Sequence, residues 1–450
     1  MPRLDPSDVA ACLRVLAALN GADDDPSAQA VREAVVSAYK SRKKQQKTAR
    51  RSASGAHDLR LLTGSDHADE RAGEQAGEQD NSDAALLRAR RCYVCKKHYR
   101  TVNRAYPLMC QPCSTGNTAR RTARCDLRGR RALVTGGRIK IGFQTALKLL
   151  RDGADVIVTT RFPHDAARRF AAEADFADWQ DRLRVHGADF LDLPSVVGLV
   201  DAVTARWGHL DILVNNAAQT ISRPFEYHRS LRAAETAAQQ AALQGAQQGA
   251  QQGPPPVPVV PATQVPALRS TVDYFPLGAL DETGEPLDLR PVNSWVLHLH
   301  EVTPREWMEV QVVNAFVPFL LTARLRPLML ASPHPDRYVV NVSAMEGSFS
   351  RRNKTSRHPH TNMAKAGLNM LTRTIAADYA RDGIHVTSVD TGWVTDERPQ
   401  GTKEAFHEAG FRVPLDVVDG AARVYDPIVR GVHGDRISGV FLKDYQVVQW

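Results

Sequence analysis

The chain has 450 residues, of which 43% are hydrophobic, and it carries a formal net charge of +8. This length is too great for one minimal domain, and the hydrophobic fraction is typical of a globular protein and excludes a wholly disordered chain. The basic balance suits a polyanionic partner or a phosphate-bearing ligand, but net charge concerns association and does not indicate the fold.

The sequence shows neither a signal-peptide core nor a membrane span. Acidic residues already occur at Asp5 and Asp8, and no apolar core follows them. The most apolar run, Val310 to Leu330, is interrupted by Asn314 and two arginines, so it falls short of the roughly 20 apolar residues that a span requires. We expect a soluble cytoplasmic protein with no membrane partner, and the basic segment 40–44 leaves a nuclear location open.

The first 50 residues (1–50) predict a helical hairpin with a basic end. Apolar residues recur at three- and four-residue spacing in 4–19 and in 27–39, and an Asp-Pro-Ser helix-start signal stands at the beginning of each run. The next segment, 51–86, is polar and has no hydrophobic period, so we predict a disordered linker there.

Residues 87–124 contain two C-x-x-C pairs, formed by Cys92, Cys95, Cys110 and Cys113. This spacing suits one tetrahedral zinc ion, and four sulfur ligands leave no open coordination position, so the ion would be structural. The many Arg, Lys and Tyr side chains around the pairs would also suit an RNA or a protein partner. The simpler interpretation is a zinc ribbon that packs against the domain that follows.

From residue 125 to 450, short β-rich runs alternate with amphipathic helices. The expected strands are Ala132–Thr135, Val156–Thr159, Arg184–Ala188, Ile212–Asn215, Tyr338–Ser343, His385–Val389 and Gly439–Leu442. This alternation predicts a Rossmann-type α/β domain, with a doubly wound parallel sheet and helices on both faces. Low-complexity sequence at about 231–291 interrupts the order and predicts a long solvent-side insertion in one loop.

The first expected strand leads into a glycine-bearing turn and then a helix, between Ala132 and Gly142. In such a turn the backbone amides at the helix start bind a diphosphate, and glycine allows the phosphate to approach closely. Glycine-rich turns also occur for packing reasons alone, so this motif needs support from others.

Three motifs together resemble those of the short-chain dehydrogenase/reductase family. Thr135, Gly136 and Gly142 match its Thr-Gly-x-x-x-Gly-x-Gly, Asn215-Asn216-Ala217-Ala218 nearly matches its Asn-Asn-Ala-Gly, and Asp189 matches an Asp near the end of its third strand. Lys140 replaces the middle glycine, so either the turn is altered or Lys140 itself reaches a phosphate. The resemblance implies a dinucleotide site that contains Thr135, Gly136, Arg138, Lys140, Ile141, Gly142, Asp189, Asn215 and Ala217.

The end of the second strand indicates which dinucleotide is bound. NAD enzymes of this type place an Asp or Glu there to bind the ribose 2′-hydroxyl, whereas this chain has Arg161. An arginine suits a 2′-phosphate and Arg138 would assist it, so the resemblance favours NADP(H) over NAD(H). The alternative is that Arg161 is an ordinary solvated residue at the start of a loop.

The resemblance also implies a catalytic Tyr and Lys on one helix face, an upstream Ser and an Asn. Lys365 and Asn314 match two of these positions. Thr361 stands at the Tyr position, and Ala344 stands at the Ser position with Ser343 one place before it. A threonine hydroxyl has a pKa far above any operating pH, so it is no substitute for the tyrosine as an acid or base.

The loss of the tyrosine leaves the proton transfer open. His358 and His360 are the nearest candidates, because imidazole titrates near neutrality. His358 lies seven residues before Lys365, which resembles the Tyr spacing of bacterial enoyl reductases in this superfamily; the alternative is an exposed loop. Thr391 and Val394 lie in a segment that resembles the family's Pro-Gly segment over the nicotinamide, where they would flank its carboxamide.

We therefore expect an NADP(H)-dependent oxidoreductase with atypical catalytic residues, acting on a small molecule that the sequence does not identify. Family members form dimers and tetramers through two helices, one of which would carry Lys365, so the resemblance implies a homo-oligomer. The alternative is a catalytically silent NADP-binding scaffold that binds RNA or a protein partner through its zinc and basic segment. Its motivation is the joint absence of the Tyr and the Ser.

Overall fold

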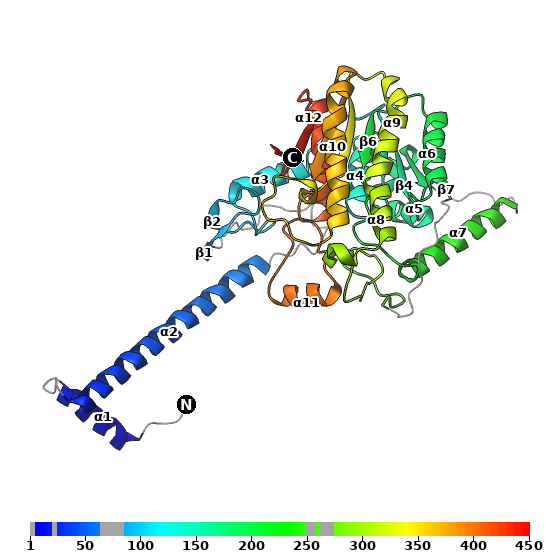
Figure 1. Cartoon of the computed structure of the whole chain (residues 1–450). Helices are drawn as coiled ribbons and strands as arrows, with labels where there is room; N and C mark the ends of the chain where they lie inside the picture. Colours follow the sequence, from blue (N-terminus) through cyan, green and yellow to red (C-terminus); the bar gives the residue numbers. More distant parts are fainter. Residues whose placement is uncertain (1–4, 20–24, 64–84, 248–256, 262–273) are drawn as a thin grey trace. The chain divides into compact units, whose positions relative to one another are not determined.

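The computed structural model describes residues 5–19, 25–63, 85–247, 257–261 and 274–450 (Figure 1). These residues form two compact units. The first contains the helices α1 (Pro6–Ala18) and α2 (Pro26–Thr63) and the antiparallel hairpin of β1 (Ala85–Arg91) and β2 (His98–Thr101). The second contains the chain from α3 (Gln111–Arg121) onward, with the short segment Tyr93–Cys95.

Both helices of the first unit begin at the predicted signals. The Asp5 carboxylate accepts a hydrogen bond from the Ser7 amide at 2.7 Å, as is typical of a residue that caps a helix start. Near the end of α2, the Asp58 carboxylate accepts hydrogen bonds from the amides of Leu87 at 2.7 Å and Arg88 at 3.1 Å. Asp58 therefore joins α2 to strand β1 within this unit.

The predicted disordered linker is wrong for residues 51–63, because α2 continues through Thr63. Most of the α2 side chains that the structure describes are exposed, and its buried residues, Ala28, Asp58 and Leu62, are too few and too far apart to form an apolar stripe in the sequence. Its Ala, Lys, Gln, Arg and Leu residues are strong helix formers. A helix that forms through propensity alone leaves no periodic pattern of hydrophobic residues. Residues 64–84, the rest of the expected linker before β1, lie outside the described residues.

In the described residues, the second unit is built on a mostly parallel sheet with the strand order β11-β10-β9-β8-β6-β3-β4-β5-β7. The strands are β3 (Arg131–Thr135), β4 (Asp155–Thr160), β5 (Leu183–Gly187), β6 (Ile212–Asn215), β7 (Val259–Val260), β8 (Arg337–Ser343), β9 (Ile384–Asp390), β10 (Val440–Lys443) and β11 (Gln446–Val448). The chain runs outward from β3 through β4 and β5, then returns to β6 on the other side. Such a reversal is where doubly wound sheets bind ligands.

Helices cover both faces of this sheet, so the predicted doubly wound α/β fold is confirmed (Figure 1). One face carries α4 (Lys140–Arg151), α5 (Pro163–Ala171) and α12 (Val417–Val432), and the other carries α6 (Leu193–Arg206), α9 (Val317–Leu330) and α10 (Pro359–Arg381). In β3, Val134 packs into the first core and Leu133 into the second, because alternate side chains point to opposite faces. Each such buried side chain contributes about 1.5–3 kcal/mol, and together they fix the strand ends at which the site forms.

The described part of segment 231–291 is not the purely solvent-side insertion that its composition predicts. Its Ala/Gln-rich start belongs to α7 (Arg229–Gln247), and Val257 is buried in the core beside α5. Strand β7 then pairs in parallel with β5 and extends the sheet. Further on, Glu285 is buried and accepts a hydrogen bond from Arg138, in the turn that follows β3. The sequence does not predict these features, because isolated buried residues such as Val257 and Glu285 form no periodic pattern in a low-complexity segment.

Helix α3, which follows the cysteine pairs, is part of the α/β unit. Asn117 donates a hydrogen bond to Asp419 at 2.9 Å, and Arg121 donates one to Asp416 at 2.7 Å. Arg423 of α12 in turn donates to the Asn117 side-chain oxygen at 3.0 Å. This unit therefore begins before residue 125, the start that the strand pattern predicts.

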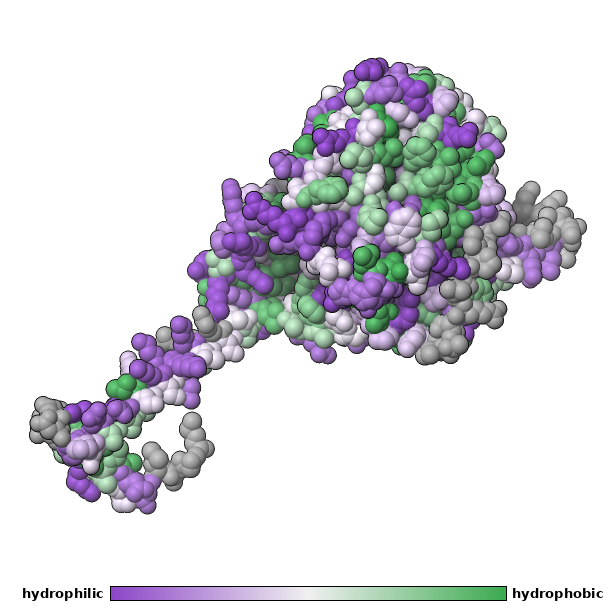
Figure 2. Space-filling view, viewed as in Figure 1, coloured by the Kyte–Doolittle hydropathy of each residue, from purple (hydrophilic) through white to green (hydrophobic). Residues whose placement is uncertain are grey.

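One helical stretch, Pro304–Leu330, is long and apolar enough to cross a membrane by length and composition. It comprises α8 (Pro304–Gln311), a π-helical turn η8 (Val312–Phe316) and α9. Half of its most apolar window (50%) is buried inside the fold, as in the core helix of a globular domain. Figure 2 shows hydrophobic side chains on the surface over α9, where Phe319 is 49% exposed. Helix α9 thus has a core face and an exposed apolar face.

Candidate cofactor and catalytic site

The turn between β3 and α4 depends on glycine. Gly136 has a φ of +66°, in the left-handed region, and a Cβ on Gly142 would overlap the Gly136 carbonyl oxygen. Lys140 also adopts a left-handed conformation, with a φ of +53°. The lysine at the family's middle glycine therefore takes a backbone conformation that glycine favours, at a cost of about 1–2 kcal/mol.

The start of α4 is open to an anion. Its N-cap residue is Ile139, and no side chain in the described part of the chain caps it. The first amides of a helix have no acceptor within the helix, so those of residues 140–142 can donate to a bound phosphate, which the helix dipole also favours. The Ile141 side chain packs against α12. A Cβ added to Gly420 of that helix would lie 2.9 Å from Ile141 Cγ1. Ile141 therefore offers its amide only.

The loop after β6 is clamped to this turn. The Thr135 hydroxyl accepts hydrogen bonds from the amides of Asn216 and Ala217, each at 2.9 Å. The Asn216 side chain donates to the carbonyl oxygens of Thr135 at 2.9 Å and Gly136 at 3.1 Å. Thr135 and Ala217 thus lie together at the switch point, and Asn216, which is part of the near match to Asn-Asn-Ala-Gly, contacts both strand ends.

Asn215 and Asp189 are buried beside the turn. The Asn215 amide nitrogen donates to Asn341 of β8 at 2.8 Å and to Thr322 of α9 at 3.3 Å, so this residue joins β6 to its neighbours. Asp189 follows β5 and accepts a hydrogen bond from the Leu191 amide at 3.1 Å. In the structure both side chains therefore brace the strand ends.

Arg161, at the end of β4, is not the solvated loop residue of the alternative interpretation. It is half-buried, its guanidinium lies 5.6 Å from the centre of the Phe162 ring, and it donates to His228 Nε2 at 3.2 Å. Because an arginine only donates, His228 accepts at Nε2 and is neutral. Burial, helped by nearby arginines, lowers the pKa of His228 well below its usual value. His228 Nδ1 is buried and has no hydrogen-bond partner among the described residues.

Arg138, in the glycine turn, is held by two carboxylates. Its guanidinium donates to Asp165 of α5 at 2.8 Å and to Glu285 of the insertion at 2.5 Å. It lies 5.3 Å from the centre of the Phe162 ring, so Arg138 and Arg161 contact the same aromatic side chain. Both arginines thus contact Phe162, and Arg138 is paired with two carboxylates whereas Arg161 donates to His228.

Lys365 lies on the buried face of α10, one turn after Thr361. Its Nζ donates a hydrogen bond to the Val342 carbonyl oxygen of β8 at 2.7 Å. Burial lowers the pKa of Lys365 to about 8. The Thr361 hydroxyl is buried and has no hydrogen-bond partner in the described residues, so a polar group is free to bind a ligand on the same helix face.

The end of β8 packs closely on this helix. A Cβ on Gly347 would lie 2.5 Å from the Lys365 carbonyl carbon, so only glycine allows the loop to pass. Ser343, the last residue of β8, is buried, and its hydroxyl has no hydrogen-bond partner among the described residues. The next loop residue but one, Met345, donates its amide to the Asp390 carboxylate of β9 at 2.7 Å. Ser343 is therefore fixed between two strand ends beside Lys365.

Asn314 lies in the π-helical turn between α8 and α9. Its side-chain oxygen accepts a hydrogen bond from the Gln219 amide at 2.6 Å, and its nitrogen donates to the Gln219 carbonyl oxygen at 3.1 Å. Single π-helical turns inside helices are frequent at functional sites, because they displace one side chain from the regular helix face. Here the π-helical turn directs the Asn314 side chain to Gln219, in the loop that follows β6.

The two candidate histidines lie just before and at the start of α10. His358, with a φ of +42°, precedes the helix; its ring stacks on Trp295 at 4.1 Å, and its Nδ1 is 3.1 Å from the Asn362 side-chain oxygen. Burial lowers its pKa. His360 is fully buried, with Nε2 3.5 Å from a Glu306 carboxylate oxygen on α8. Being five residues before Lys365, His360 lies about 140° around the helix from it, whereas His358 lies before the helix, where the helical period does not apply.

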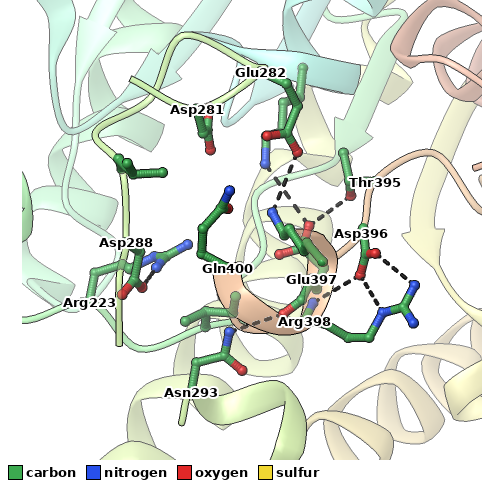
Figure 3. A pocket seen from close by; sticks show the side chains of 14 residues that line it. Arg223, Asp281, Glu282, Asp288, Asn293, Thr395, Asp396, Glu397, Arg398 and Gln400 are labelled. Carbon is green, nitrogen blue, oxygen red and sulfur yellow. Dashed lines mark hydrogen bonds and ion pairs between the residues drawn. The ribbon is translucent and has the colours of Figure 1, made fainter. Parts of the chain in front are cut away.

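A charged recess, open to solvent, adjoins the glycine turn at Lys140 (Figure 3). It is lined by Lys140, Ile221, Arg223, Asp281, Glu282, Leu287, Asp288, Asn293, Thr395, Asp396, Glu397, Arg398, Gln400 and Lys403. The Nζ of Lys140 lies 4.0 Å from a Glu397 carboxylate oxygen, and Asn293 donates to the Glu397 carbonyl oxygen at 3.0 Å. The segment after β9, which includes half-buried Thr391 and buried Val394, thus approaches the glycine turn.

The four predicted metal ligands come together. The sulfur atoms of Cys92, Cys95, Cys110 and Cys113 all lie within 4.8 Å of one another. The Cys110 amide donates to the Cys92 sulfur at 3.3 Å, a contact that stabilises a thiolate. Four thiolate donors at this separation form a set that fits a tetrahedral zinc ion, with no position left for a substrate.

Two family descriptions match the second unit. The model of the short chain dehydrogenase family matches residues 130–241, and that of the Enoyl-(Acyl carrier protein) reductase family matches residues 294–416. The chain belongs to the short-chain dehydrogenase/reductase family. The two matches leave out most of the insertion, as expected for a segment added to one loop of the family fold.

One related protein matches most of the chain, and several named enzymes match a shorter part of it. The Uncharacterized protein R665 of Acanthamoeba polyphaga mimivirus is 34% identical over 363 residues, which are 75% of this chain and 71% of that protein. Carbonyl reductase [NADPH] 1 of Sus scrofa is 39% identical over 100 residues, which are 22% of this chain and 34% of that enzyme. A solved structure of NADPH-bound carbonyl reductase from chicken fatty liver covers 72% of this chain at 18% identity, with a TM-score of 0.46.

The residues for which the sequence resemblance implies a catalytic role are held in place or buried. Lys365 and Asn314 are fixed by hydrogen bonds. The side chains of Thr361 and Ser343 are buried. The residues that sequence reasoning missed, above all His228 and Glu285, come from the loops around the insertion, which match no motif.

Proposed function

We propose that the chain is an NADP(H)-dependent oxidoreductase that acts on a small molecule. The proposal depends most on the turn of residues 135–142, whose uncapped helix amides lie at the switch point and whose shape Asn216 and Thr135 hold. The left-handed Gly136, the close packing of Gly142 against the Gly136 carbonyl and the open helix start all suit a turn that binds a dinucleotide diphosphate.

A bound nicotinamide supplies or accepts the hydride, and the chain's own residues then handle the proton and the orientation of the substrate. Lys365 donates one N–H to Val342 and keeps further N–H groups for a ligand. With a pKa of about 8, it holds a proton at Nζ near neutral pH and can pass it to a substrate oxygen. The buried hydroxyls of Thr361 and Ser343 orient that oxygen by hydrogen bonds.

The residues after β4 support a preference for NADP(H). Arg161 and neutral His228 form a hydrogen-bonded pair that suits a 2′-phosphate, and no Asp or Glu stands at the end of β4 to bind a ribose 2′-hydroxyl. The pig relative bears NADPH in its name. The relatives with a named activity are oxidoreductases, which supports an enzyme over a silent scaffold.

Direct titration of NADPH and NADH tests the proposal. We expect the purified full chain to bind NADPH with a lower Kd than NADH, and Gly142→Ala to lose this binding, because the added methyl group meets the Gly136 carbonyl. Gly198→Ala in α6 is the matched control, since an added Cβ there has nothing within 4 Å. Failure of the wild-type chain to bind either dinucleotide would refute the proposal.

We further propose that the four cysteines hold one structural zinc ion. The closed thiolate set supports binding without catalysis, because catalytic zinc needs an open position. Cys113 lies in α3, which packs on α12, so the ion would stabilise the start of the α/β unit.

A further inference from the structure

The basic cluster that would receive a 2′-phosphate contains a carboxylate from the insertion. Glu285 is 5% exposed and pairs with Arg138, which is 6% exposed. Arg169 of α5 donates to the Gly284 carbonyl oxygen at 3.1 Å and lies 3.5 Å from the other Glu285 oxygen. Asp165 pairs with Arg138, Arg169 and the exposed Arg168, so the group holds three arginines and two acids, and Arg138 is the one that contacts both carboxylates from a buried position.

Arg161 lies next to this group but has a different partner. It contacts the Phe162 ring, as Arg138 does, and donates to neutral His228. A phosphate bound by Arg161 and His228 would therefore lie in the field of the Glu285 carboxylate. Like charges in a buried site repel strongly, because little water separates them.

We infer that Glu285 is a specificity-determining residue of the dinucleotide site, which weakens the binding of a 2′-phosphate by occupying Arg138 and by its own charge. The inference rests on the proposed dinucleotide function. The insertion would then help to discriminate between dinucleotides with and without a 2′-phosphate. The Glu285 carboxylate would repel the phosphate, while the arginines attract it.

The loop that carries Glu285 keeps its shape without this side chain. The Asp281 carboxylate accepts hydrogen bonds from the amides of Thr283 at 2.8 Å and Glu285 at 3.1 Å, and the Asp281 amide donates to the Glu285 carbonyl oxygen at 2.8 Å. Arg138 also keeps Asp165 as a partner when Glu285 is neutralised. A Glu285→Gln substitution is therefore expected to fold and to change mainly the local charge.

Calorimetric titration with two nucleotides isolates the effect of the 2′-phosphate. Adenosine 2′,5′-bisphosphate and 5′-AMP differ only by this group, and neither carries a nicotinamide. For Glu285→Gln we expect the ratio of their Kd values to shift about tenfold toward the bisphosphate, which corresponds to about 1.4 kcal/mol, with the Kd of 5′-AMP unchanged. The control is Asp336→Asn, which weakens another buried Arg–carboxylate pair, with Arg130, at the amino end of β8; its ratio should equal that of the wild type.

The outcomes separate the inference from the proposed function. If Glu285→Gln binds both nucleotides with the wild-type ratio, the inference is overturned and the proposed function stands. If the wild-type chain binds neither nucleotide, both are overturned. Should Glu285→Gln fail to fold, Glu285→Asp decides, because it keeps the charge but withdraws it from Arg138; a smaller shift in the same direction supports the inference, and an unchanged ratio overturns it.

Discussion

At the scale of single residues, burial of Lys365 sets the pH range in which its ammonium group can donate a proton. Its ammonium group is buried, and the cost of desolvating the charge lowers its pKa from 10.5 to about 8. The protonated form is the one that can give a proton to a substrate oxygen during reduction. The proton supply should therefore fail as the pH rises through about 8.

We expect kcat/KM for reduction to fall about tenfold per pH unit above about pH 8, and Lys365→Ala to lose about 10²- to 10⁴-fold in activity together with this pH dependence. The matched control is Lys148→Ala, because the half-buried Lys148 also has a pKa lowered by burial to about 8, but donates to the Arg121 carbonyl oxygen at the far end of α4. Steady-state kinetics from pH 6 to 10 measure both. An unchanged alkaline limb in Lys365→Ala would contradict this role.

Unfolding does not explain that expected loss. Since the folded state binds the Lys365 proton less tightly than the unfolded chain, the contribution of this group to the free energy of unfolding increases as the pH rises from about 8 to about 10.5. Activity and this stability contribution therefore change in opposite directions, which distinguishes proton transfer from a merely structural role.

Single residues also show what sequence reading can and cannot reach. The four-residue spacing of Thr361 and Lys365 places both on one helix face, and the structure has them so. Near the end of β6, however, it is Asn216 that clamps the glycine turn, while Asn215 braces the neighbouring strands. Motif position did not decide between adjacent asparagines, because the direction of a side chain at a strand end depends on the twist and contacts of the folded sheet.

At the scale of elements, local signals predicted where helices begin better than where they end. The caps of α1 and α2 are where the Asp-Pro-Ser runs predict them. The length of α2 and the helical character of α7 were missed, because both depend on helix propensity in stretches without a regular apolar stripe. The glycine turn was predictable because its backbone chemistry is local, whereas the partners of Arg138 come from α5 and from the insertion.

The cysteine pairs are the element whose behaviour is most directly measurable. We expect one zinc ion per chain by elemental mass spectrometry, and a loss of this ion in Cys92→Ser, because three remaining thiolates no longer close a tetrahedral site. Removing the ion with a chelator should lower the melting temperature, since Cys113 lies in the helix that packs on α12. Cys12→Ser is the control, as Cys12 is exposed in α1 and outside the cluster. Zinc content equal in Cys92→Ser and wild type would rule out this site.

At the scale of the whole molecule, the surface of the second unit predicts self-association. Phe316 and Phe319, at and after the start of α9, are 41% and 49% exposed, and Met363 and Met370 of the neighbouring α10 are 52% and 55% exposed. Exposed apolar side chains gathered on adjacent helices are typical of an interface, since burying them gives about 25 cal/mol per Å². We therefore expect the chain to form a homodimer through these two helices.

Light scattering after size exclusion measures this directly: the wild-type mass should be about twice 49.6 kDa. Phe319→Asp should return the mass to that of one chain, because burying an unpaired carboxylate in an apolar interface costs several kcal/mol. Leu277→Asp is the control, since Leu277 is 71% exposed and lies in a turn that belongs to neither helix. A wild-type mass of one chain at every concentration would contradict the dimer, whereas dissociation by both variants would place the contact elsewhere on the surface.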